Sequence, residues 1–356
     1  MAKTYNIIGV MSGSSLDGLD ICFCSFEHSE KGWTFSMPYA ETYAYSSKWK
    51  NHLKTAFQST AKAFVELDKN FGELIGQKIS DFIREHQIKH VDFVASHGHT
   101  VFHNPENNYS SQIGSGAHIA AVANLPSITN FRSLDTALGG QGAPLVPIGD
   151  ELLFGEYDFC INLGGYSNIS YKSDNKRIAY DICPVNKVLN HLAEKERKEF
   201  DKNGKIGRKG KVNKALLEKL NALDFYQQKG PKSLGDEWLH NNFFSLLDKY
   251  RVNLENVDVM RTVYEHIAIQ IANVTKQSRN KRILATGGGT HNQFLIENIK
   301  NKNSNYLIIP ENKLIDFKES LIFAFMGALR AEHKINCLAS VTGAKKDSSG
   351  GIIYYI

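Results

Sequence analysis

Three short loops rich in glycine and hydroxyl-bearing residues each follow an apolar run, and they constrain the fold more than any other feature. They read GVMSGSSLDGLD at 9–20, LGGYSN at 163–168 and TGGGT at 286–290. Glycine lets the backbone approach an anion closely and adopt positive φ. Exposed N–H groups in such a turn, or at the start of a following helix, bind phosphate oxygens. Three such loops spread over the chain predict a nucleotide held between two halves of a protein.

The pattern of strands and helices occurs twice. Strand, loop, strand, strand and helix are predicted from residue 5 and again from residue 158, which indicates an internally duplicated α/β fold. The first loop joins two strands, and neither GxGxxG nor GxxxxGK[ST] occurs in it, which argues against a Rossmann unit and a P-loop. Strands are predicted at 5–10, 19–26, 33–45 (broken at Pro38), 91–95, 127–130, 158–163, 168–172, 177–182, 282–285 and 352–356. Helices are predicted at 47–86, 116–123, 184–194, 259–276, 290–301 and 318–332, with a linker or hinge at 137–144.

Length and composition limit the function classes. A chain of 356 residues favours two domains. The net charge of +5 comes without an arginine-rich stripe, so no nucleic-acid partner is expected. The five cysteines are scattered, as expected in a reducing compartment. No apolar run is long enough for a signal segment or a membrane span, so a cytoplasmic protein without a membrane partner is expected.

Several side chains in this pattern could carry chemistry. Hydroxyls of the first loop could bind phosphate and its Asp17 and Asp20 could bind Mg²⁺, or the loop could be a hairpin turn with capping aspartates. Asp181 ends an apolar strand, where a carboxylate suits a general base, although a helix-capping role is common there. His97 and His99 share a strand face, but no further metal ligand lies nearby in sequence. Arg132 and Asp135 could form an ordinary ion pair.

Five motifs resemble one family. They are residues 9–18, SHGHT at 96–100, Phe131-Arg132, GGQGAPLVP at 139–147 and SVTGA at 340–344. In this order, over nearly the whole chain, they resemble the anhydro-N-acetylmuramic acid kinase family of the sugar kinase/Hsp70/actin superfamily. The resemblance implies a two-domain, duplicated, ribonuclease H-like α/β fold with an ATP cleft between the domains. The implied domains are 1–135 with about 336–356, and 136–335 with a helical insertion at about 194–250.

The resemblance also implies the reaction and its residues. The expected enzyme is an ATP- and Mg²⁺-dependent kinase, a cytoplasmic homodimer that opens the 1,6-anhydro ring of its amino sugar and phosphorylates O6 in murein recycling. Asp181 is the implied general base, Asp17 the implied Mg²⁺ ligand, and Thr100, Arg132, Asn186 and Glu319 the implied sugar ligands. The implied ATP-binding residues are Gly13, Ser14, Ser15, Leu16, Asp17, Gly18, Leu19, Asp20, Gly164, Gly165, Gly287, Gly288 and Gly289.

The chain departs from the family pattern near these residues. The family reads Asp-Thr-Gly-Pro-Gly-Asn where this chain has DICPVN at 181–186, so Ile182, Cys183 and Val185 make the loop bulkier. Leu234 and Asp236 stand where the family tends to have Thr and Arg, which removes a basic contact, and His99 replaces Gln. These departures leave two alternatives open: a kinase of a different (anhydro)sugar, and a non-catalytic nucleotide-binding sensor.

Overall fold

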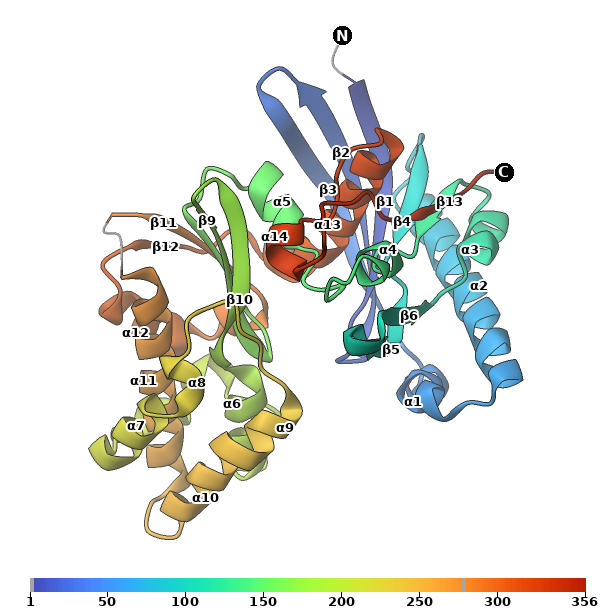
Figure 1. Cartoon of the computed structure of the whole chain (residues 1–356). Helices are drawn as coiled ribbons and strands as arrows, with labels where there is room; N and C mark the ends of the chain where they lie inside the picture. Colours follow the sequence, from blue (N-terminus) through green and yellow to red (C-terminus); the bar gives the residue numbers. More distant parts are fainter. Residues whose placement is uncertain (1–2, 277–279) are drawn as a thin grey trace. The chain divides into compact units, whose positions relative to one another are not determined.

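The computed structural model describes residues 3–276 and 280–356, which form two compact units (Figure 1). Unit 1 comprises Met1–Leu153 and Phe317–Ile356, and unit 2 comprises Phe154–Asp316. The division falls at 153/154 and 316/317, whereas the sequence placed it at 135/136 and 335/336. The difference arises because residues 137–144 and the helix near residue 320 both pack within unit 1, as described below.

Unit 1 contains a sheet of six strands in the order β13-β7-β4-β1-β2-β3. β1 pairs with β2, and β2 with β3, in antiparallel fashion. β1–β4 and β4–β7 are parallel, and β13 closes the far edge antiparallel to β7. The strands are β1 (Lys3–Ser12), β2 (Gly18–Ser29), β3 (Gly32–Ala44), β4 (Phe93–Ser96), β7 (Ser127–Thr129) and β13 (Ile352–Tyr354).

The sheet of unit 2 repeats this arrangement in the order β10-β9-β8-β11-β12. Its first three strands are antiparallel in chain order, and its last two add parallel to β8 and to each other. The strands are β8 (Phe159–Leu163), β9 (Tyr166–Ser173), β10 (Lys176–Pro184), β11 (Arg282–Thr286) and β12 (Tyr306–Ile308). The same order and directions in both units confirm the duplication predicted from the sequence.

β3 is continuous through Pro38, so the predicted break is wrong. The register of β2 and β3 shifts between Phe23 and Ser25, where one residue of β2 faces two of β3. β3 is the edge strand, so the missing N–H of Pro38 need not remove a ladder hydrogen bond. A bulge at a sheet edge therefore accommodates the proline without ending the strand.

Helices cover both faces of the first sheet. Alternate residues of β1 point to opposite sides, and both sets are buried against helices. Ile8 and Val10 belong to a buried cluster with Phe71 and Ile75 of α2 (Ala61–Glu85). Gly9, between them, faces α13 (Asn312–Ala331), where a Cβ would lie 2.1 Å from the carbonyl oxygen of Ser320. This close approach fixes most of α13 to unit 1.

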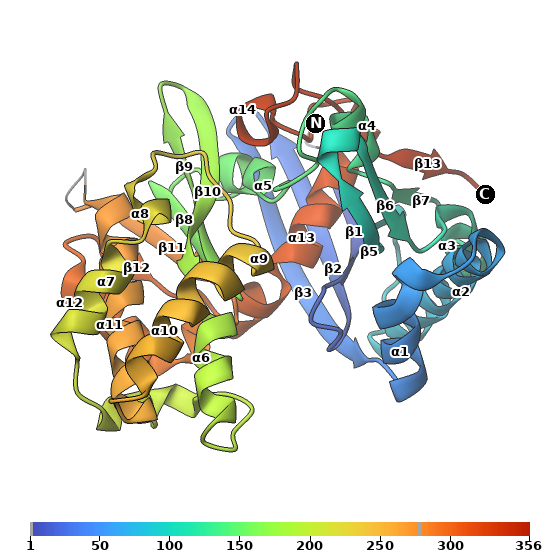
Figure 2. The same ribbon diagram turned by 60° about the horizontal axis from the view of Figure 1, so that its bottom comes forward.

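The predicted helix at 47–86 is two helices in the structure. α1 (Ser47–Thr55) is followed by a short 3₁₀ turn, and α2 starts afresh after Thr60, whose hydroxyl accepts from the Ala63 N–H at 3.3 Å. α2 packs side by side with α3 (Gly116–Ala123) in both views (Figures 1 and 2). The sequence pattern did not predict the separate start of α2, because only a short polar stretch, which includes Ser59 and Thr60, lies between two segments with an apolar face.

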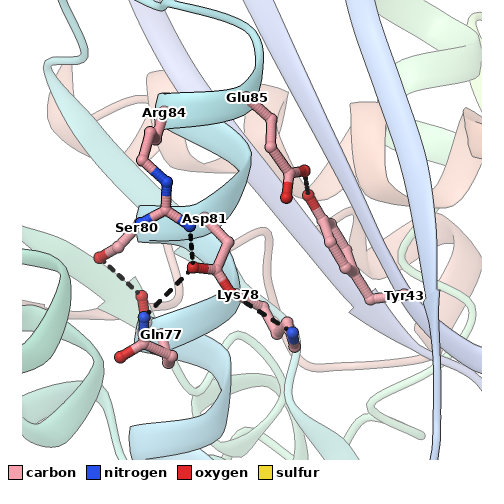
Figure 3. A network of polar contacts seen from close by, with 8 residues as sticks. Tyr43, Gln77, Lys78, Ser80, Asp81, Arg84 and Glu85 are labelled. Atoms are coloured by element: carbon pink, nitrogen blue, oxygen red, sulfur yellow. Dashed lines mark hydrogen bonds and ion pairs between the residues drawn. The ribbon is translucent and has the colours of Figure 1, made fainter.

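A polar network lies along α2 (Figure 3). Asp81 accepts from Arg84 at 2.7 Å and from Gln77 and Lys78 at 3.3 Å, and Arg84 is the main cause that lowers the pKa of Asp81. Tyr43 of β3 donates to Glu85 at 2.6 Å. The network therefore ties the end of α2 to the edge strand of the sheet.

In unit 2 the helices gather largely on one side of the sheet (Figure 2). Their core combines β8, β9 and β10 with α6 (Asn186–Glu194), α7 (Lys214–Asn221), α10 (Ser245–Arg251), α11 (Asn256–Thr275) and α12 (Gln293–Lys302). α12 begins three residues later than predicted, because a 3₁₀ turn, Gly288–His291, intervenes. Over residues 3–276 and 280–356, no helix is both long and apolar enough to cross a membrane.

Candidate active site

The first glycine loop lies between β1 and β2 in unit 1. Ser12, at the end of β1, is buried and lies in a hydrogen-bonded chain: the Tyr45 hydroxyl donates to Ser12 Oγ at 2.7 Å, and Ser12 Oγ lies 3.0 Å from His99 Nδ1. This fixes the base of the loop to the segment that carries Thr100.

The loop itself presents its polar groups to solvent. Ser14, Ser15 and Asp17 are exposed. Leu16 has a φ of 59°, and its N–H bonds back to the Gly13 carbonyl at 3.4 Å. Asp20, on β2, accepts from Thr42 of β3 at 2.6 Å. The two aspartates therefore differ: Asp17 is in a position to meet a ligand, whereas Asp20 is engaged in the sheet.

Arg132 is held in place by His97. Its Nε–H donates to His97 Nε2 at 2.9 Å, and its Nη1 donates to the Gly142 carbonyl. Since an arginine Nε can only donate, His97 Nε2 must accept, and Nδ1 must carry the proton that bonds the Gly98 carbonyl at 2.9 Å. Burial lowers the pKa of His97 well below its usual value, with Arg132 as a further cause. His97 is therefore a neutral residue that positions Arg132.

Asp135 organises the glycine-rich stretch around Arg132 and does not act as a simple ion-pair partner. It is buried and accepts from the Gly142 N–H at 2.8 Å, Thr342 Oγ1 at 2.7 Å and Cys337 Sγ at 3.1 Å. The stretch predicted as a hinge is also bonded from Gln141 N–H to the Thr342 carbonyl at 2.8 Å. Two motifs far apart in sequence thus meet at one carboxylate inside unit 1.

Two more predicted sugar ligands belong to unit 1. Thr100 lies on a hairpin of β5 (His99–Asn104) and β6 (Tyr109–Ile113) that the sequence pattern missed, and it accepts from Gln112 at 3.4 Å. Glu319 of α13 is accessible to solvent, yet the protein around it raises the pKa of its carboxyl. Arg132 is the largest influence in the opposite direction, which places the two charges in electrostatic contact.

The second and third glycine loops meet in unit 2. Gly287 has a φ of 86°, and a Cβ there would lie 2.3 Å from Asn162 Oδ1, so only glycine fits. Asn186 Nδ2 donates to the Leu163 carbonyl at 3.2 Å. The N–H groups of Val185 and Asn186 donate to the carbonyls of Gly165 and Gly164 at 2.8 and 3.2 Å. The second loop therefore caps α6 with its carbonyls. The third loop has more room, since a Cβ at Gly288 would meet only Asn186, at 3.9 Å.

Asp181 lies near the end of β10, opposite Asn168 of β9 and beside a register shift. Its N–H donates to the Lys232 carbonyl at 2.9 Å, and its Oδ2 accepts from the Leu234 N–H at 2.8 Å. Burial is the main cause that raises the pKa of this carboxyl, and the Leu234 hydrogen bond acts against it. A half-buried carboxylate with a raised pKa has the properties of a general base.

Asp236 has a partner that the sequence did not reveal. It forms an ion pair with Lys187 in the first turn of α6, and it accepts from the Tyr166 hydroxyl at 2.7 Å. The Lys187 ammonium also lies 4.9 Å from the centre of the Tyr166 ring. The carboxylate that replaces a family arginine thus bonds a lysine from the helix that follows Asp181.

The histidines near Arg132 do not form a metal site. Among the residues that the structure describes, no group of three or more His, Cys, Asp or Glu side chains is arranged to hold a metal ion. His97 and His99 instead bond Arg132 and Ser12, and His103 Nδ1 lies 3.1 Å from Ser110 Oγ.

A family model described as anhydro-N-acetylmuramic acid kinase matches residues 5–356. The chain belongs to this family. It is 31% identical to the anhydro-N-acetylmuramic acid kinase of Actinobacillus pleuropneumoniae serotype 5b (strain L20), over 98% of each chain. It is 33% identical to the enzyme of that name from Pasteurella multocida (strain Pm70), over 99% of this chain and 97% of that one.

Family membership confirms the resemblance seen in the sequence and the expected phosphotransferase class. The repeated strand order agrees with the duplicated sugar kinase/Hsp70/actin-like fold. Among solved structures, the chain is similar to component A of (R)-2-hydroxyglutaryl-CoA dehydratase from Acidaminococcus fermentans. That match has a TM-score of 0.44 and 10% identity, and covers 90% of this chain and 96% of the other.

Proposed function

We propose that this protein is an ATP-dependent kinase that hydrolytically opens the 1,6-anhydro ring of 1,6-anhydro-N-acetylmuramic acid and phosphorylates O6. The product is N-acetylmuramic acid 6-phosphate, and the step belongs to murein recycling. Family membership supports the kinase activity. The observation that supports the ring-opening chemistry is the carboxylate of Asp181, half-buried at a strand end with its pKa raised.

Asp181 would act as the base on water. Oδ2 is held by the Leu234 N–H, so we assign proton abstraction to Oδ1. The water oxygen forms a bond to the anomeric carbon as its proton moves to Asp181, and the bond from that carbon to O6 breaks. The freed O6 takes the γ-phosphoryl group of ATP, and ADP leaves. The base step parallels inverting glycoside hydrolysis, with phosphoryl transfer to O6 in place of its protonation.

Other residues would bind and orient the two substrates. Residues 13–20, with the exposed hydroxyls of Ser14 and Ser15, would bind the phosphates of ATP, and the third loop, with its open Gly288, suits the nucleoside end. Gly164 and Gly165 would support this site through α6. Arg132 would bind the lactyl carboxylate of the sugar, with Thr100, Asn186 and Glu319 at its hydroxyls.

Mg²⁺ would be held by Asp17 together with the ATP phosphates. The exposed carboxylate of Asp17 next to Ser14 and Ser15 fits a cation that takes only one or two protein ligands. The ion would neutralise charge on the phosphates during transfer. A cytoplasmic location and a homodimer are part of the same proposal, because the buried free cysteines suit a reducing compartment and the family resemblance implies the dimer.

Asp181→Asn tests this assignment. Removing the base should lower sugar-dependent ADP release by about 10²–10⁴-fold, while ATP still binds. Asp174→Asn, at the exposed turn between β9 and β10, is the matched control and should retain normal turnover. ADP release and ATP affinity would be measured with and without the anhydro sugar. Near-normal turnover of Asp181→Asn would rule out the proposed role.

The bulkier loop around Asp181 favours one alternative, a kinase of a different sugar. ADP release stimulated only by another sugar would support that alternative. In that case Arg132→Met should matter little for a sugar without a carboxylate. No stimulation by any sugar, with ATP still bound, would support a nucleotide sensor.

A further inference from the structure

Residues 231–236, here called the strap, run alongside the end of β10. The Asp181 N–H donates to the Lys232 carbonyl at 2.9 Å, and the Leu234 N–H donates to Asp181 Oδ2 at 2.8 Å. The strap therefore holds both the backbone and the carboxylate of the same residue. A carboxylate fixed by a backbone N–H on one oxygen can present the other in a defined direction.

A lysine anchors the start of the strap. Lys232 Nζ donates to the carbonyls of Phe225 and Gln228 at 2.7 and 3.1 Å, at the end of α8 (Asp224–Gln227). The same ammonium lies 4.3 Å from the centre of the Phe225 ring. A cation at the last carbonyls of a helix is a favourable arrangement, so this end of the strap is fixed to α8.

Asp236 anchors the other end. Its bonds to Lys187 and Tyr166 join the strap to α6 and β9, the two elements that flank Asp181 in the fold. The pair is solvent-exposed, with side-chain exposures of 40% for Lys187 and 63% for Asp236, so its energy is modest. Its effect is on position, because it holds the strap to the helix that begins five residues after Asp181.

The groups that face Asp181 leave the Leu234 N–H as its main polar contact. They are Tyr166 on β9 and Cys183 on β10, with the uncharged Asn168 opposite and the Lys232 backbone carbonyl bonded to the Asp181 N–H. The pKa values of Tyr166 and Cys183 are raised chiefly by burial, so both are neutral at pH 7. The Lys232 ammonium is engaged by carbonyls of α8.

We propose that the strap positions Asp181 for proton transfer: the Leu234 N–H selects which carboxylate oxygen accepts the proton and limits its basicity, and Lys232 and Asp236 hold that N–H in place. This inference rests on the proposed role of Asp181 as the base. Leu234 and Asp236 stand where the family tends to have Thr and Arg, and in this proposal both help to position Asp181. The contact at 234 uses the backbone, so the side chain there is free to vary.

The test removes the N–H of Leu234 and keeps its side chain. The amide of Leu234 is replaced by an ester in the full-length protein, by inserting the α-hydroxy analogue of leucine. Protein with leucine inserted by the same route is the matched control. Two quantities are measured: the pKa of the Asp181 carboxyl, by NMR of ¹³C-labelled aspartate with Asp181→Asn for assignment, and the acidic limb of kcat/KM against pH.

Loss of the N–H should raise both values by about 1 to 2 pH units, because the hydrogen bond favours the charged form of Asp181. Leu234→Ala keeps the N–H and should leave the carboxyl pKa where it is in the parent protein. An unchanged pKa in the ester protein would overturn the inference. If the parent protein shows no sugar-dependent turnover, the proposed function fails, and the NMR pKa still decides whether the strap controls the carboxylate.

A charge exchange tests the anchor. Asp236→Lys places two like charges together and should lower kcat more than it raises the KM for ATP. Adding Lys187→Asp restores an opposite pair and should recover kcat and the acidic limb of the pH profile together. If neither kcat nor the acidic limb recovers in the double variant, Asp236 and Lys187 have no part in positioning Asp181.

Discussion

At the residue scale, the site depends on side chains that orient other side chains. Arg132, His97 and Asp135 were all noted in the sequence, but the way the last two support Arg132 was not predicted. His97 is held neutral by burial and accepts the Nε–H, and Asp135 holds the Gly142 loop whose carbonyl accepts from Nη1. With Nε and Nη1 engaged by the protein, Nη2 is the nitrogen we assign to an anionic group of the sugar.

This arrangement predicts a selective effect of His97→Phe. The ring still packs on Phe323, whose centre lies 4.6 Å from that of His97, but the acceptor for Arg132 is lost. We expect a rise of about 10- to 100-fold in the KM for the acidic sugar, as for a hydrogen bond to a charged group. The affinity for ATP should change little. The measurement is a double-mutant cycle with Arg132→Met, in which the two effects should not add; full additivity would contradict the role given to His97.

At the scale of elements, the pattern of apolar runs predicted every strand of the two main sheets except β12, because loops and turns separate the others clearly. It failed where structure depends on contacts distant in sequence. The β5–β6 hairpin has polar and aromatic residues without clear alternation. The strap meets Asp181 across 53 residues of sequence, so no local signal marks it. The family resemblance identified Asp181 and Arg132, but the groups that position them were visible only in the structure.

The third glycine loop gives a prediction with an internal control. Gly287→Ala puts a Cβ 2.3 Å from Asn162 Oδ1 at a φ of 86°, so we expect unit 2 to lose about 1–3 kcal/mol of its free energy of unfolding. At Gly288 the nearest atom to a Cβ would lie at 3.9 Å, so Gly288→Ala should fold normally. Urea unfolding followed by tryptophan fluorescence, with Trp33 and Trp49 replaced by Phe so that only Trp238 of unit 2 reports, separates the two. Any change in ATP affinity of Gly288→Ala then reports on the nucleotide site; equal stability of both variants would contradict the packing described.

At the scale of the whole molecule, one strand arrangement occurs twice and carries different chemistry each time. The loop after β1 in unit 1 offers exposed hydroxyls and Asp17. The corresponding loop after β8 in unit 2 caps α6 with its carbonyls and supports the region of Asp181. The equivalent turns have therefore diverged: we assign phosphate binding to the first, and positioning of the base to the second.

The central claim is that one reaction adds both water and a phosphoryl group to the sugar. It is tested most directly by mass spectrometry of the product formed from ATP and 1,6-anhydro-N-acetylmuramic acid in ¹⁸O-water at short reaction times. Unlabelled product kept in the same water corrects for exchange at the anomeric carbon. We predict a product with one phosphoryl group and one ¹⁸O at that carbon. A phosphorylated sugar with its anhydro ring intact, or no phosphorylated sugar at all, would contradict the account.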